Sequence, residues 1–312
     1  MIQTVLGAIK PEELGITLMH EHVLCDFGGA DQVGPGRYDL EEVVLVMLPH
    51  LISLRQAGGN TLVDCTPNFL GRDVSLLKRL SEESRLHLIT CTGYYKGASL
   101  PRQVAESSAD QVAASLVAET EQGIAGTEIR PGLIKMAVEA GTLGEVQQKM
   151  LRAAARAHLQ TGLTIAVHSE DWAAAAHELD LLAEEGVAPQ ALIWVHADSG
   201  VNNNEQRKTA AARGAWVELD AIGLTSLGYQ LDFQVEMVLE LLAAGFEDQL
   251  LLSQDAGWYT VGEPHGGAPR PYHILLTEFV PALEQAGVPR ATIDRLLIDN
   301  PRRALTPKIR RS

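Results

Sequence analysis

Short apolar runs alternate with longer helical patterns along almost the whole chain, and this alternation restricts the fold more than any other feature. The runs are four to six residues long and continuous, as in parallel strands buried on both faces. The eight runs are Gly15–Met19, Thr61–Cys65, Leu86–Cys91, Gly132–Met136, Leu163–Val167, Ala191–Val195, Ala215–Leu219 and Leu250–Ser253. Eight strands alternating with helices predict a single (β/α)₈ (TIM) barrel domain over residues 1–312.

Helical patterns fill the intervals between these runs, and several of them end at a glycine, as helices commonly do. The expected helices are Leu40–Gln56 with Asp39 as its N-cap, Val104–Gln122, Gly144–Gln160, Trp172–Glu185 and Phe233–Ala244. An open, doubly wound sheet is the alternative, but such sheets usually have fewer strands, and no GxGxxG motif follows the first run. The longest irregular stretches, Phe27–Arg37 and Trp258–Pro271, each follow an expected strand end, where a barrel carries its functional loops.

The net charge and the spacing of the cysteines indicate which partners and which cellular compartment to expect. Lys and Arg number 25 against 40 Asp and Glu, a net charge of −15, which argues against nucleic acid or an anionic membrane as a partner. Cys25, Cys65 and Cys91 are widely spaced, which favours buried free thiols in a reducing compartment over a disulfide framework. No signal-peptide pattern and no apolar run long enough to span a membrane is evident, so we expect a cytoplasmic protein.

Side chains that can bind metals follow several of the expected strands. The first run leads into His20-Glu21-His22, and Lys135, His168, His196 and Asp255 stand at the ends of the fourth, fifth, sixth and eighth. In a barrel these strand ends converge on one mouth, so four of the ten histidines are expected at one level.

The HxH pair places two imidazoles on the same side of a strand, because strand side chains repeat every two residues. Two imidazoles and a carboxylate suit zinc, manganese or iron. A single histidine at a barrel rim is more often an ordinary polar residue, but four at four strand ends favour a metal site. Lys135 differs, because a protonated lysine cannot bind a cation. From the residues alone, a lysine paired with a carboxylate remains its leading interpretation.

Seven segments carry a likeness to a known family. They are GITLMHEHV (15–23), TGYY (92–95), GLIKMA (132–137), AVHSE (166–170), WVHAD (194–198), LSQDAGWY (252–259) and LLIDNPRRAL (296–305). On these segments the chain resembles the phosphotriesterase family of the amidohydrolase superfamily, including its lactonase-like members, nearly end to end.

The resemblance implies a binuclear metal centre. His20, His22 and Asp255 would hold one divalent cation, and His168 and His196 would hold the second. Lys135, as N6-carboxylysine, and a hydroxide would bridge the two. Zinc is the first candidate, with manganese, cobalt or iron as alternatives. Asp255 would also accept the proton of the attacking hydroxide, and Tyr95 would orient the substrate oxygen.

The sequence departs from the family pattern around the substrate. Ala221 stands where relatives carry a basic residue, and the position of Asp198 is only near that of their additional aspartate, which weakens the expectation of the usual proton relay. The loop 258–272 is more polar than the lactonase loop. We expect Arg270 and Trp258 as substrate contacts, with His265 and Tyr272 as further polar candidates.

The favoured function is therefore hydrolysis of a lactone or another carboxylic ester by attack of a metal-bridging hydroxide. The alternative is a phosphotriesterase or other phosphoester hydrolase at the same site. A deaminase or cyclic-amide hydrolase is less favoured, and a metal-binding protein without turnover is the candidate from a different class. We expect a small-molecule substrate, no nucleic-acid or membrane partner, and leave a homodimer open.

Overall fold

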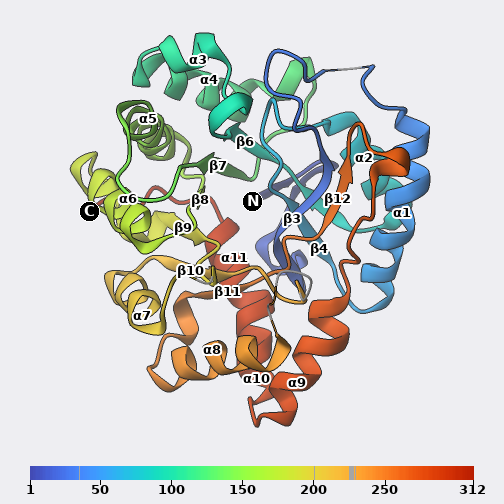
Figure 1. Ribbon diagram of the computed structural model, residues 1–312, viewed down its shortest axis with the longest axis vertical. Coiled ribbons are helices and arrows are strands. Elements are labelled where there is room, and N and C mark those ends of the chain that lie inside the picture. The colour runs from blue at the N-terminus through green and yellow to red at the C-terminus, as the bar shows by residue number, and fades with distance from the viewer. Residues whose placement is uncertain (35, 200, 225–227, 229) are drawn as a thin grey trace.

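A computed structural model describes residues 1–34, 36–199, 201–224, 228 and 230–312; residue 35, in the expected irregular stretch 27–37, lies outside the described residues. Figure 1 shows strands gathered at the centre of the molecule with helices arranged around them. The central strands are β3 (Thr17–Cys25), β4 (Thr61–Asp64), β5 (His87–Ile89), β6 (Cys91–Tyr94), β7 (Leu133–Ala137), β8 (Ile165–His168), β9 (Leu192–Val195), β10 (Trp216–Leu219) and β11 (Leu250–Leu252). All eight expected strands are confirmed, with β5 and β6 as two halves of the third.

The strands form two parallel sheets that meet at two seams. One sheet has the order β11-β10-β9-β8-β7-β6, and the other has the order β12-β3-β4-β5, where β12 is Gly257–Thr260. The first seam lies at Thr90, which separates β5 from β6 within one strand. At the second seam, beyond β11, the Asp255 N–H donates to the His20 carbonyl (3.1 Å) and the Ser253 hydroxyl accepts from the His20 N–H (2.8 Å). The sequence prediction of a (β/α)₈ fold is therefore confirmed.

Helices surround this ring and a small hairpin adjoins it. The hairpin is β1 (Ile2–Thr4) and β2 (Gly7–Ile9). The helices are α1 (Leu40–Gln56), α2 (Val74–Ser84), α3 (Arg102–Glu106), α4 (Ala109–Gln122), α5 (Glu145–Thr161), α6 (Trp172–Glu184), α7 (Asn204–Arg213), α8 (Leu231–Ala243), α9 (Val280–Gln285), α10 (Arg290–Asp294) and α11 (Asn300–Leu305). Asp39 caps α1 as expected, accepting from the N–H groups of Glu41 and Glu42. Among the described residues, no helix is long and apolar enough to cross a membrane.

Three expectations about local structure were wrong. The stretch expected to be one helix over Val104–Gln122 is two, because Ser108 accepts from the Gln111 N–H (3.2 Å) and so starts α4 with its own N-cap. The strand β3 does not stop at the HEH motif but continues to Cys25. The expected irregular stretch from Trp258 contains a strand, β12 (Gly257–Thr260), which pairs in parallel with β3.

The inward-facing side chains of the barrel change from apolar to polar along its strands. A buried apolar cluster fills one end of the barrel and includes Leu133 of β7, Ala166 of β8 and Trp216 of β10. Two residues further along these strands, on the same side of each, stand Lys135, His168 and Glu218. The apolar layer thus forms a floor, and polar side chains gather above it toward the carboxyl ends of the strands, where barrels carry their sites.

Candidate metal centre

His20 and His22 point to the same side of β3, as the two-residue repeat of a strand requires. Both side chains are buried, and their ring centroids lie 5.3 Å apart. The Nδ1 atom of each ring faces an oxygen: His20 Nδ1 lies 3.3 Å from Glu218 Oε2, and His22 Nδ1 lies 2.8 Å from Thr66 Oγ1. These contacts fix the rings and leave the Nε2 atoms free to bind a cation.

Asp255 brings a carboxylate to these two imidazoles. Its Oδ1 lies 3.2 Å from His22 Nε2 and 3.9 Å from His20 Nε2. This oxygen is buried, yet it has no hydrogen-bond partner among the described residues. Ligand atoms of the three side chains lie within 4.8 Å of one another, and a buried carboxylate oxygen aimed at two imidazoles is what a divalent cation requires. These residues therefore fit a metal ion.

Two more histidines lie beside this group. His196 Nε2 is 2.8 Å from His168 Nδ1, and the His196 ring centroid is 5.1 Å from that of His20. Lys135 is fully buried in β7, in register with Ala166 of β8. No hydrogen bond or ion pair engages the Lys135 amine within the described ranges.

The structure brings every expected metal ligand into one place. A cavity of about 40 Å³ is lined by the four histidines, Lys135 and Asp255, together with Tyr95, Trp258, Phe27, Leu70 and Cys25. The structure shows that these six side chains line one cavity; their roles in metal binding and catalysis stay predictions. The sequence could reveal this convergence because these residues follow, or lie within, five strands of one barrel, with His20 and His22 sharing β3.

Burial and neighbouring charges keep His20, His168 and Asp255 in metal-binding forms. Burial, Lys135 and the other histidines lower the pKa of His20 well below its usual value, and burial with His196 and Lys135 does the same for His168. Burial acts to raise the pKa of Asp255, but His22, His196 and Lys135 outweigh it and hold that pKa at about 2. Neutral imidazoles and an ionised carboxylate are the forms that bind cations.

Asp220 and Glu218 form a layer beneath the histidines that the sequence analysis did not identify as functional. Asp220 Oδ2 accepts from the His196 N–H (2.9 Å), and Asp220 Oδ1 lies 2.7 Å from His196 Nδ1. Both acids are buried; Glu218 lies in β10 and Asp220 directly follows this strand, two residues further along, so both point to its inward face. That spacing was the signal in the sequence that could have identified them.

His196 and Asp255 are both held with positive φ, at 62° and 48°. Such a backbone is unfavourable for non-glycine residues and persists only where surrounding contacts fix it. Around Asp255, Glu21 supplies these contacts by accepting from the N–H groups of Gln254 (3.0 Å) and Ala256 (2.6 Å).

Arg270 lies on the other side of the Asp255 turn. Its guanidinium donates to the carbonyls of Gln254 (3.0 Å), Asp255 (3.1 Å) and Ile222 (3.3 Å). These bonds hold the backbone of the turn and use three of the five N–H donors of the guanidinium. The expected substrate role of Arg270 stays a prediction, and a positioning role is the alternative that its contacts favour.

Tyr95 and Trp258 both line the cavity, beside different histidines. The Tyr95 hydroxyl lies 3.4 Å from His168 Nδ1, and the Trp258 ring centroid lies 5.1 Å from that of His22. Trp258 Nε1 is buried without a hydrogen-bond partner in the part of the chain described. The further candidates lie elsewhere: His265 is an exposed partner of Glu42, and Tyr272 donates from its buried hydroxyl to the His22 carbonyl (2.7 Å).

Comparison with known proteins identifies the family of this chain. A sequence profile of the phosphotriesterase family matches residues 1–305. The Phosphotriesterase homology protein of Escherichia coli (strain K12) is 31% identical over 288 residues, which cover 92% of this chain and 96% of the relative. The N-acetyltaurine hydrolase of Salmo salar is 28% identical over 344 residues, covering 98% of each chain. The Phosphotriesterase-related protein of Nematostella vectensis is 27% identical over 352 residues, covering 99% of each.

Proposed function

This chain belongs to the phosphotriesterase family of metal-dependent hydrolases, and we propose that it hydrolyses a carboxylic acyl bond, in a lactone or another carboxylic ester. The observation that carries the proposal is the convergence of four histidines, Lys135 and Asp255 on one small cavity with Tyr95 in its wall. A set of nitrogen and carboxylate ligands around one space can hold cations that activate water at neutral pH.

The residues divide into two candidate ligand sets. His20, His22 and Asp255 would hold one cation, and His168 and His196 the other. Lys135, carried as N6-carboxylysine, would supply an anionic bridge between them. Zinc is the first candidate, with manganese, cobalt or iron as alternatives. When bound, two such cations would lower the pKa of a water molecule and polarise the substrate oxygen.

The chain's own residues would then orient the substrate and move a proton. Asp255 is ionised at neutral pH, with its pKa held at about 2, and is placed to accept a proton from the attacking water. Burial raises the pKa of Tyr95, as do the charges of Asp255 and Glu170, so its hydroxyl stays protonated and can donate to the substrate oxygen. The Trp258 N–H, which has no hydrogen-bond partner among the described residues, offers a second donor in the lining of the cavity.

Within this class we prefer a small lactone or ester with a polar or anionic group over one with a long alkyl chain. The loop 258–272 beside the cavity is polar and contains Arg270, which supports this preference.

Relatives named N-acetyltaurine hydrolase make a simple amide the second candidate, because an amide presents the same kind of acyl carbon to the site. Phosphoester hydrolysis remains the alternative at the same ligands, supported by the family and by relatives named after phosphotriesterase.

One comparative assay tests the proposal. Metal-loaded protein is given a small lactone, an aryl acetate, N-acetyltaurine and a phosphotriester, each with and without a chelator. We expect chelator-sensitive turnover of an acyl substrate, lost in Asp255→Asn and retained in the matched surface variant Asp180→Asn. Turnover of the phosphotriester alone would overturn the choice of acyl substrate, and turnover that survives complete metal removal would overturn the mechanism.

A further inference from the structure

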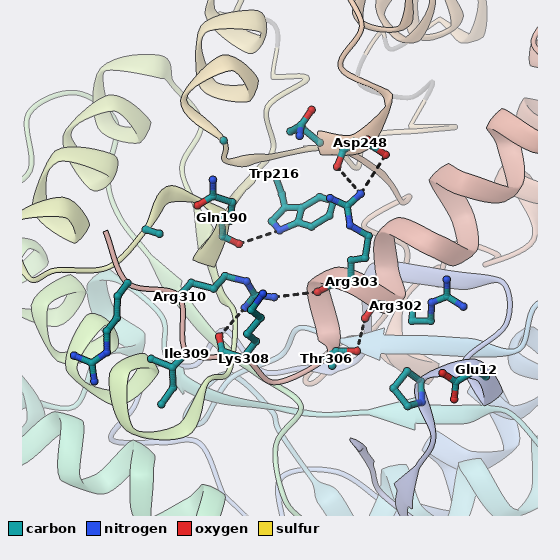
Figure 2. A pocket seen from close by; sticks show the side chains of 15 residues that line it. Glu12, Gln190, Trp216, Asp248, Arg302, Arg303, Thr306, Lys308, Ile309 and Arg310 are labelled. Atoms are coloured by element: carbon teal, nitrogen blue, oxygen red, sulfur yellow. Dashed lines mark hydrogen bonds and ion pairs between the residues drawn. The ribbon is translucent and has the colours of Figure 1, made fainter.

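A second, larger pocket lies at the opposite end of the barrel from the metal centre. It has a volume of about 700 Å³ and is bordered by Trp216 at the start of β10 and by residues of the segment 302–311. Figure 2 shows this pocket with the Arg310 side chain at the centre of the group, between Lys308 and the Trp216 indole. The pocket shares no lining residue with the cavity at the metal centre.

The pocket is rich in cations although the chain is strongly acidic. Its lining includes Arg302, Arg303, Lys308, Arg310 and Arg311, in a protein of net charge −15. Carboxylates already pair with Arg302 (Asp299, 2.7 Å) and with Arg303 (Asp248, 3.2 Å).

The other three cations, Lys308, Arg310 and Arg311, have no carboxylate partner among the described residues. The acidic lining residues are Glu12 and Asp248, and the second is already paired with Arg303. The pocket therefore holds an excess of positive charge without its own counter-ions.

Arg310 is the most constrained of these cations. Its guanidinium donates to the Thr164 hydroxyl (3.2 Å) and to the backbone carbonyls of Lys308 (3.2 Å) and Arg303 (3.0 Å). All of these acceptors are neutral. Burial and the charge of Arg303 lower the pKa of Arg310, which means that its positive charge is poorly compensated where it lies. A bound anion would supply that compensation.

We propose that this pocket binds the phosphate group of a small molecule. Guanidinium groups match the oxygen geometry of phosphate, and a dianion can be shared by several cations more effectively than a single carboxylate charge. The pocket's volume accommodates a phosphorylated metabolite, and the Arg303 guanidinium lies over the buried Trp216 indole at 5.2 Å. A long polyanion fits less well, because the rest of this acidic surface would repel it.

Calorimetric titration of the metal-loaded protein with inorganic phosphate and with glycerol 3-phosphate tests this, at an ionic strength held constant with sodium chloride. We expect saturable binding that weakens by about tenfold or more in Arg310→Gln, the scale on which a charge-assisted pair contributes. Lys308→Gln, at an exposed position whose amine has no hydrogen bond or ion pair among the described residues, should weaken binding in the same direction even if Arg310→Gln folds poorly. Tighter binding of the ester than of free phosphate would identify an organic phosphate as the ligand.

Two controls separate this pocket from other anion sites. Arg102→Gln removes an exposed arginine of α3 and should bind as the wild type does, and so should Lys135→Ala, which is expected to lose most of the metal at the opposite end of the barrel. Wild-type affinity in both Arg310→Gln and Lys308→Gln would overturn the proposal, as would loss of binding in Lys135→Ala. If acetate bound as tightly as phosphate, the binding would reflect general charge attraction, and the phosphate site would be wrong. If a single-stranded oligonucleotide bound and phosphate did not, the pocket would bind a different class of ligand, which would also contradict the proposal.

Discussion

The carboxylate of Asp220 contacts His196 at two points: Oδ1 lies 2.7 Å from the ring Nδ1, and Oδ2 accepts from the backbone N–H at 2.9 Å. Asp220 therefore sets both the orientation of the imidazole and the unusual backbone of the residue, whose φ is 62°. Although burial acts to lower the pKa of His196, Asp220 raises it by charge and hydrogen bonding, so the same contact increases the basicity of this ligand.

Asp220→Asn should impair the second metal position without unfolding the protein. The amide can keep one hydrogen bond but loses the negative charge that supports His196, and losses of about 10–100-fold in metal affinity or activity are usual for such partners. Metal titration and kcat are the measurements, with Asp180→Asn, an exposed aspartate of α6, as the control. Unchanged metal affinity and unchanged kcat would show that His196 does not depend on Asp220.

Metal content and the state of Lys135 can be tested together. We expect close to two divalent ions per chain in carefully loaded protein. Lys135→Ala should lose most of the metal and the activity, and added short carboxylates with bicarbonate should partly restore both, because they can replace an anionic bridge. Elemental analysis checks the first point, and Lys208→Ala, on the surface of α7, is the matched control. A bare amine at Lys135 in a crystal structure of metal-loaded protein would contradict the bridging role.

Asp255→Asn keeps an oxygen ligand but removes the proton acceptor. Turnover should therefore fall by about 10²–10⁴-fold, the usual scale for the loss of general acid–base assistance, while much of the metal is retained. Parallel measurement of kcat and bound metal separates the two functions of this side chain. A variant with full metal and near-normal kcat would assign the proton transfer to another group.

The sequence was sufficient for the barrel and for the metal ligands because both depend on local patterns. Apolar runs identify buried strands, and His168, His196 and Asp255 stand at or just after the carboxyl ends of three of them. Glu21 shows what such patterns cannot provide. It lies between the two histidines of the HEH motif, yet its partners are the backbone groups of Gln254 and Ala256, more than 230 residues later.

The sequence did not predict the strand β12, for a related reason. The stretch from Trp258 is rich in Gly and Pro, and four residues of strand in it are stabilised by pairing with β3 rather than by their own pattern. Gly257 is required at its start: with φ at 88°, a β-carbon there would lie 1.9 Å from the His22 carbonyl oxygen. Only the assembled barrel reveals that this approach occurs.

Stability should depend on pH through Glu178. This glutamate of α6 is buried, its carboxylate oxygens have no hydrogen-bond partner among the residues described, and burial raises its pKa to about 8 from an ordinary 4.5. A group whose pKa is raised on folding stabilises the fold below its unfolded pKa, and this stabilisation is lost as the pH rises toward the folded value. Glu178→Gln should thus resemble the wild type near pH 4.5 and become progressively more stable than it up to about pH 8.

Urea unfolding at several pH values measures this difference, which should reach a few kcal/mol on a scale of about 1.4 kcal/mol per pKa unit. Glu236→Gln, at an exposed position of α8, is the control and should show no such trend. A difference between wild type and Glu178→Gln that stays constant with pH would mean that the glutamate is compensated in the fold.

Arg270 allows the substrate and positioning roles to be separated. If its guanidinium only holds the Asp255 turn through the carbonyls of Gln254 and Asp255, Arg270→Ala should lower kcat for every substrate and reduce the melting temperature. If it also contacts an anionic group of the substrate, KM should rise for anionic substrates and stay unchanged for neutral ones. We expect the first pattern, because all three of its hydrogen bonds already have backbone acceptors.

Kinetics with paired neutral and anionic esters, alongside Arg290→Ala on the distant surface of α10, make the measurement. A selective rise in KM without a change in kcat or melting temperature would instead establish Arg270 as a substrate-binding residue.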